Sequence, residues 1–128
     1  MNRPTLGALA LALVLALAPV TVCASPKHVA RGNFGRPAAC AGIPWCGCWL
    51  RLRLGISDAR LNLARAWASV GAPAPGPAAG VVAVWAHHVG VITENLGGGM
   101  IRLLSGNDGH AVRDRVRSTR GIIAYRHV

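Results

Sequence analysis

The chain has 128 residues and a formal net charge of +10 at neutral pH, with 14 Lys and Arg against four Asp and Glu. Once an apolar N-terminal segment is set aside, this length allows one small domain with one core and excludes a second domain. The basic balance indicates association with anionic partners, but it carries no information about fold or chemistry.

The N-terminal residues have the three parts of an export signal. Arg3 supplies a positive charge, residues 6–20 form an apolar run, and Val22-Cys23-Ala24 offers small residues for cleavage. We expect a signal peptide at residues 1–24, removed on export to the periplasm or the extracellular space. The alternative is an uncleaved anchor that associates the protein, at least transiently, with the membrane, because the uncharged stretch 4–26 is almost long enough to span a bilayer.

Export also bears on the meaning of the charge. Without Arg3 the mature chain keeps 13 basic and four acidic side chains, which gives a formal charge of +9. An exported protein is not expected to bind nucleic acid, so the charge favours anionic cell-envelope polymers, acidic lipids or carboxylate-bearing peptides. A soluble basic surface without a partner is an equally good interpretation.

Three cysteines remain after export, namely Cys40, Cys46 and Cys48. An odd number in an oxidising compartment predicts one disulfide and one free thiol. Cys46 and Cys48 are too close in sequence to bridge each other without strain, so Cys40 is expected to pair with one of them. On a helix these two positions point about 200° apart, and only one of them can face a cleft.

Residues 25–43 are rich in Pro, Gly, Ala and basic side chains and have no periodicity. This composition predicts a flexible approach segment ahead of a domain at residues 44–128.

Two helices are predicted in the first half of that domain. Residues 45–54 have Trp and Leu at helical spacing, and Gly55 provides a C-terminal stop. Alternation within residues 50–54 would also fit a strand, but the capping residues that follow favour the helix. A second helix is predicted to begin at residues 57–58 and to stop near Gly71.

After a proline-rich connector at residues 72–80, the hydrophobic period changes from 3.6 to 2. Four short apolar or β-branched runs predict strands, at residues 81–85, 89–93, 100–105 and 122–125. Residues 95–99 are a strong hairpin signal. The sequence therefore predicts an α+β domain in which a small antiparallel sheet packs against the N-terminal helices.

The boundary between loop and helix at residues 44–51 is where we expect chemistry. A cysteine at a helix start lies at the positive end of the helix dipole and near unpaired backbone N–H groups, which favour the thiolate. Acyl transfer by a thiol also needs a base and a group that holds the imidazole. The tryptophans are most simply core or pocket-wall residues, and the Cys and His spacing does not fit a structural zinc site.

One candidate exists for each of the two supporting roles. His88 opens a predicted strand in which Gly90 would allow close approach, whereas His87 alternates to the opposite face. Asn107 lies in the turn that ends the next strand. Each has a simpler explanation, since strand-edge histidines are usually structural and Asn-Asp-Gly is turn chemistry.

Four motifs follow one another in the order Pro44-Trp45-Cys46, residues 79–85, His88-Val89-Gly90-Val91-Ile92 and Ser105-Gly106-Asn107. Together they resemble the CHAP branch of the NlpC/P60 cysteine peptidases and amidases, over residues 44–126. The resemblance implies a papain-like α+β fold that cleaves amide bonds in peptidoglycan peptides. It implies Cys46 as the nucleophile, His88 as the general base and Asn107 as the residue that orients the imidazole. We expect a monomer that needs no cofactor and no metal.

Some positions depart from the family pattern. Ser105 stands where an acidic residue is often found, and Val81 replaces an aspartate that is common before the first strand. The stretch Cys46-Gly47-Cys48-Trp49 is also similar to the Cys-Gly-x-Cys-Trp of papain, in which the later cysteine reacts, although it is one residue shorter. Cys48 is therefore the alternative nucleophile, with Cys40 bonded to whichever cysteine does not react. The alternative function is a catalytically inactive, basic module that binds anionic wall polymers.

Overall fold

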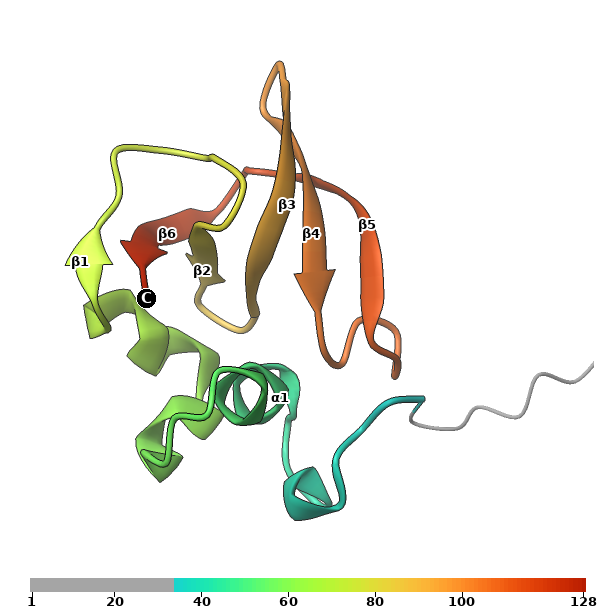
Figure 1. Cartoon of the computed structure of the whole chain (residues 1–128). Helices are drawn as coiled ribbons and strands as arrows, with labels where there is room; N and C mark the ends of the chain where they lie inside the picture. The colour runs from blue at the N-terminus through green and yellow to red at the C-terminus, as the bar shows by residue number, and fades with distance from the viewer. Residues whose placement is uncertain (1–33) are drawn as a thin grey trace, which may run out of the picture.

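The computed structural model describes residues 34–128, so the predicted signal peptide and the first part of the approach segment lie outside the described residues. The elements follow the order η1 (Ala38–Cys40), α1 (Cys46–Arg53), η2 (Ala59–Asn62), η3 (Ala64–Ser69), β1 (Ala72–Pro73), β2 (Val82–Trp85), β3 (Val89–Gly97), β4 (Met100–Ser105), β5 (Arg113–Ser118) and β6 (Ile122–His127). The strands form one antiparallel sheet in the order β1-β6-β2-β3-β4-β5, and the helical segments lie together beside it (Figure 1). The predicted α+β class is confirmed.

The sheet is strongly curved. Residues 119–121 alone join β5 to β6, which are four positions apart in the sheet. Flat strands spaced about 4.8 Å apart would put about 19 Å between them, whereas such a link reaches about 15 Å at most. Trp85 on β2 reflects the closure, because its indole donates a hydrogen bond to the Arg120 carbonyl at 2.9 Å and the Arg117 guanidinium lies 5.8 Å from its ring.

Two apolar layers lie on opposite faces of the sheet. The layer toward the helices contains the buried side chains of Trp45, Trp49, Leu50, Trp67, Val82, Val84 and Val89. The layer on the other face contains Val81, Ala83, Ile92, Ile101 and Leu103. Side chains alternate along a strand, so β2 contributes to both layers, which explains its uninterrupted apolar sequence.

Helix α1 is held between η2 and the turn after β4 by two glycines. A Cβ atom on Gly47 would lie 2.6 Å from the Asn62 carbonyl oxygen, and one on Gly106 would lie 2.7 Å from the Trp49 Cβ. Neither site has room for a side chain. The first turn of α1, which carries Cys46, is therefore fixed from both sides.

The prediction of one continuous helix after Gly55 is wrong. Two 3₁₀ helices, η2 and η3, take its place, separated by Leu63 in an extended conformation (φ −84°, ψ 125°). The buried Trp67 indole donates a hydrogen bond to the Leu61 carbonyl at 2.8 Å, which occupies an acceptor that an α-helix would use for its own backbone. The predicted cap is present, since the Asp58 side chain accepts from the Arg60 N–H.

The four predicted strands are present, and β3 and β6 extend beyond their predicted ends. The predicted hairpin turn joins β3 to β4, with Gly98 and Gly99 at φ +59° and +76°. Strands β1 and β5 were not predicted. Strand β5 is an edge strand with the sequence Arg-Asp-Arg-Val-Arg-Ser, which lacks the apolar alternation that marks a strand but suits an exposed edge.

The described part of the approach segment packs against the domain. Cys40 is fully buried within η1, and Phe34 forms a bridge to Ala111. Residues 34–43 thus belong to the folded unit. No helix within residues 34–128 is long and apolar enough to cross a membrane.

Candidate functional site

The structure separates the roles of the three cysteines. Cys40 and Cys48 form a disulfide with Cα atoms 5.9 Å apart, and Cys46 is a free thiol. Of the two pairings left open by the sequence, this is the one that joins Cys40 to the later cysteine of α1. Cys46 is accordingly the cysteine available for chemistry.

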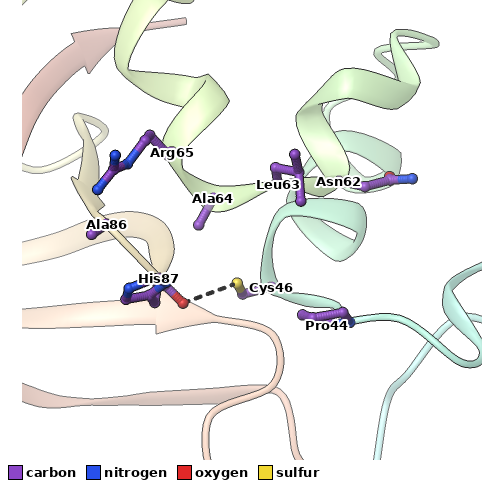
Figure 2. A pocket seen from close by; sticks show the side chains of 8 residues that line it. All are labelled: Pro44, Cys46, Asn62, Leu63, Ala64, Arg65, Ala86 and His87. Atoms are coloured by element: carbon purple, nitrogen blue, oxygen red, sulfur yellow. Dashed lines mark hydrogen bonds between the residues drawn. The ribbon is translucent and has the colours of Figure 1, made fainter.

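The Cys46 thiol lies at the N-terminus of α1 and faces a cavity of about 340 Å³. The other lining residues are Pro44, Asn62, Leu63, Ala64, Arg65, Ala86 and His87. Figure 2 shows Cys46 among them, with its sulfur directed at the His87 carbonyl oxygen, 4.0 Å away. Although only 3 % of Cys46 is exposed, its sulfur borders a space that a small substrate group could enter.

Burial raises the pKa of the Cys46 thiol above its ordinary value. The backbone N–H groups of Gly47 and Val89 and the charge of Arg117 lower this pKa, but their effect is smaller than that of burial. The expectation that the helix start lowers the pKa of Cys46 is therefore wrong. Desolvation of the charged form outweighs the helix terminus, and the resting group is a neutral thiol.

His88 forms a hydrogen bond through its Nε2 to the Ser105 hydroxyl, at 2.9 Å. Gly90 makes this contact possible, because a Cβ atom at position 90 would lie 2.8 Å from the Ser105 Cβ. The Trp85 ring lies beside the imidazole, with ring centroids 6.2 Å apart. His88 is thus held at the start of β3 by a residue from the end of β4.

The environment keeps the His88 imidazole neutral at physiological pH. Burial, followed by the positive charges of Arg117 and Arg115, lowers its pKa to about 4, although the carboxylate of Asp108 acts in the opposite direction. A neutral imidazole has one free nitrogen lone pair, so His88 is in the protonation state that a general base requires.

Cys46 lies against the backbone on both sides of His88. The thiol contacts the His87 carbonyl and the Val89 N–H, the two backbone groups that flank His88. The contacts of the sulfur are therefore with this backbone, and the hydrogen-bonding partner of the His88 ring is Ser105. His87 is the histidine that lines the cavity (Figure 2).

Asn107 lies in the turn after β4 and is half-buried, with φ +53°. Within residues 34–128 its side chain makes no hydrogen bond to His88, so the orienting role expected from the family pattern is unsupported by a contact. Ser105, two residues earlier, makes that contact instead. No signal in the sequence indicated this contact, because it depends on the register between β3 and β4.

A second polar cluster was not predicted. The Asp108 carboxylate, 2 % exposed, accepts hydrogen bonds from Arg115 and from Arg117, the latter at 3.3 Å. Arg117 also stacks over Trp85 and affects the pKa values of both Cys46 and His88. The sequence shows arginines at alternate positions of β5, which places them on one face of that strand. Their contact with Asp108 and Trp85 depends on the curvature of the sheet, which the sequence does not show.

No protein-family model, no curated protein and no solved structure matches this chain. Among the residues described, no group of three or more His, Cys, Asp or Glu side chains is placed to hold a metal ion. The interpretation of the site therefore depends on its own geometry and on the sequence motifs.

Proposed function

We propose that this protein is an exported cysteine hydrolase with a papain-like fold that cleaves amide bonds in peptidoglycan peptides. The observation that supports it best is the free thiol of Cys46, which borders a cavity at the start of α1 and contacts the backbone on both sides of His88. The motifs that resemble the CHAP branch of the NlpC/P60 enzymes supply the substrate class.

In the proposed mechanism, Nε2–H of His88 donates to the Ser105 oxygen, which leaves Nδ1 as the proton acceptor. Nδ1 takes the Cys46 proton as the sulfur attacks the substrate carbonyl carbon. Collapse of the tetrahedral intermediate breaks the C–N bond, and the imidazolium protonates the departing amine. Water, deprotonated by His88, then converts the thioester to a carboxylic acid and regenerates the thiol.

The neutral forms of the Cys46 thiol and the His88 imidazole determine when the proton is transferred in this mechanism. Burial raises the pKa of Cys46 and lowers that of His88, so a preformed thiolate–imidazolium pair is disfavoured and proton transfer accompanies the attack. The developing oxyanion would be stabilised by N–H groups of the first turn of α1, where the Cys46 and Gly47 amides already interact with the sulfur.

Export is part of the proposal. A disulfide between Cys40 and Cys48 is typical of proteins that fold in an oxidising compartment, which agrees with the predicted signal peptide.

The test is digestion of purified peptidoglycan by the mature protein and by its Cys46→Ala, His88→Ala and His87→Ala variants, with release of new amino and carboxyl groups as the readout. We expect activity in the wild type, none in the first two variants and substantial activity in the third. Activity that survives Cys46→Ala would refute the proposal. Loss in His87→Ala with retention in His88→Ala would transfer the base to His87, the histidine that lines the cavity.

A further inference from the structure

Arg65 is the cationic group of the Cys46 cavity, and none of the residues 34–128 is its hydrogen-bond or ion-pair partner. It is exposed on η3, and among residues 34–128 its side chain forms no hydrogen bond or ion pair. Three of the four acidic side chains, Asp58, Asp108 and Asp114, each bond to other arginines. The guanidinium is therefore available for an external anion.

The remaining cavity wall is mostly apolar and shaped by small side chains. Ala64 and Ala86 leave space next to the thiol, and Pro44 and Leu63 form other parts of the wall (Figure 2). Leu63 has an extended backbone, and its side chain is 66 % exposed beside the cavity. An apolar stem of a bound molecule would cover it.

Asn62 supplies a second polar group with a fixed orientation. Its Oδ1 accepts a hydrogen bond from Arg51 Nε at 3.0 Å, and Arg51 is itself held by the Ile56 carbonyl. This contact holds the amide in place, and Figure 2 shows the Asn62 side chain directed away from Cys46. Besides Cys46, the polar lining residues are thus Asn62, Arg65 and His87, and the others are apolar.

We propose that the cavity is a subsite for a short peptide segment that bears a free carboxylate, with Arg65 as the group that binds the carboxylate. The inference rests on the proposed function and names the substrate class of the same site. A volume of about 340 Å³ is near the lower end of small-molecule sites, which run from about 300 to 1,000 Å³, so it fits a short segment of a polymer. A guanidinium binds a carboxylate through two parallel N–H···O bonds, which gives direction as well as charge.

The experiment compares alkylation of Cys46 by iodoacetate, which is anionic, and by iodoacetamide, which is neutral and of similar size. The rates are measured on the folded mature protein with its disulfide intact, and the modified residue is identified by peptide mapping. The ratio of the two rates cancels any change in the thiolate fraction, so it reports the attraction of the cavity for the carboxylate. The variants are Arg65→Ala, Arg65→Lys and Arg65→Glu.

We expect the iodoacetate-to-iodoacetamide ratio to fall about three- to tenfold in Arg65→Ala, to fall further in Arg65→Glu and to be largely kept in Arg65→Lys. The matched control is Arg120→Ala, which removes the same charge from an exposed arginine outside the cavity. The effect should shrink in high salt, because the charges are partly exposed.

An unchanged ratio in Arg65→Ala, an equal fall in Arg120→Ala, or no reaction of Cys46 with either reagent would overturn the subsite. A ratio that depends on Arg65 in a protein that digests no peptidoglycan would keep the subsite and refute the hydrolase. In an active enzyme, Arg65→Ala should raise KM for a peptide with a free carboxylate and leave KM for its amidated form unchanged.

Discussion

Ser105 is the residue on which the geometry of His88 depends. Its hydroxyl is fully buried and accepts from, or donates to, the Nε2 of the imidazole. Ser105→Ala should lower kcat about three- to tenfold with little change in KM, because one hydrogen bond that orients the base is lost. Ser105→Thr keeps the hydroxyl and should recover most of the activity.

The matched comparison is Asn107→Ala, which removes the side chain expected from the family pattern to orient the base. Kinetics of both variants on the same peptidoglycan preparation, with circular dichroism to check folding, decide between the two residues. A larger loss of kcat in Asn107→Ala than in Ser105→Ala would contradict the assignment and restore the family role of Asn107.

The buried imidazole also predicts how stability depends on pH. The pKa of His88 is about 4 in the folded protein, against an ordinary value of 6.5. Between these values the unfolded chain binds the proton and the folded protein does not, so the free energy of unfolding decreases as the pH falls from about 7 to 4. The decrease from this group is at most about 3 kcal/mol.

Urea denaturation at several pH values tests this expectation, with His88→Gln as the variant that removes the titrating group. The free energy of unfolding of the wild type should fall relative to that of His88→Gln as the pH falls toward 4, and the offset should then stay constant, since both states bind the proton below that value. Parallel stability curves for the wild type and His88→Gln across the whole range would show that His88 is not held in its neutral form.

The sequence identified Cys46 and His88 because each belongs to a short motif whose residues are neighbours along the chain. Ser105 could not be assigned in the same way, since its contact with His88 depends on the register between β3 and β4. The direction in which the pKa of Cys46 is shifted could not be predicted from the sequence either. A helix start is visible in a sequence, but the burial that outweighs it is produced by tertiary packing.

At the level of secondary-structure elements, the position of α1 depends on glycine at residue 47. Alanine there would gain about 1 kcal/mol of helix propensity. The new methyl group would, however, meet the backbone carbonyls of Leu61 and Asn62, which cannot move without displacing η2. Overpacking of this kind outweighs the propensity, and we expect Gly47→Ala to reduce the free energy of unfolding by about 1–3 kcal/mol.

Gly76→Ala is the matched control, because a Cβ atom at that position would have no neighbour within 4 Å. Chemical denaturation should place this variant within about 0.5 kcal/mol of the wild type. If Gly47→Ala were as stable as Gly76→Ala, the close contact between α1 and η2 would be wrong.

The elements differ in how far the sequence determined them. The strands with β-branched or apolar patterns and the glycine turn between β3 and β4 were predicted, because their signals are local. The division of residues 57–70 into η2 and η3 was not, since it follows from the hydrogen bond between the Trp67 indole and the Leu61 carbonyl. The charged strand β5 has almost no apolar pattern and becomes a strand through its pairing with β4.

At the level of the whole molecule, the disulfide ties η1 to the start of α1. A loop closed over a sequence separation of 8 is expected to stabilise the fold by about 2–3 kcal/mol, mainly by restricting the unfolded chain. The Cys40→Ser and Cys48→Ser variants should both lose this amount in denaturant titrations. Cys46→Ser provides the control, because it removes a thiol without opening the loop. Its free energy of unfolding should still decrease when a reducing agent breaks the disulfide.

The net charge predicts wall binding for both the hydrolase and the alternative of an inactive binding module. With a formal charge of +10, the protein should bind anionic cell-wall polymers, and binding should weaken strongly between about 0.05 and 0.5 M salt as the Debye length shortens. Cys46→Ala leaves the charge intact and should bind equally well, so binding alone does not distinguish the two functions. The two functions are distinguished by co-sedimentation of the wild type and Cys46→Ala with purified walls, followed by an assay of soluble fragments. The hydrolase predicts equal, salt-sensitive binding with fragments released by the wild type alone, whereas binding that persists unchanged at high salt would show that charge is not what attaches the protein.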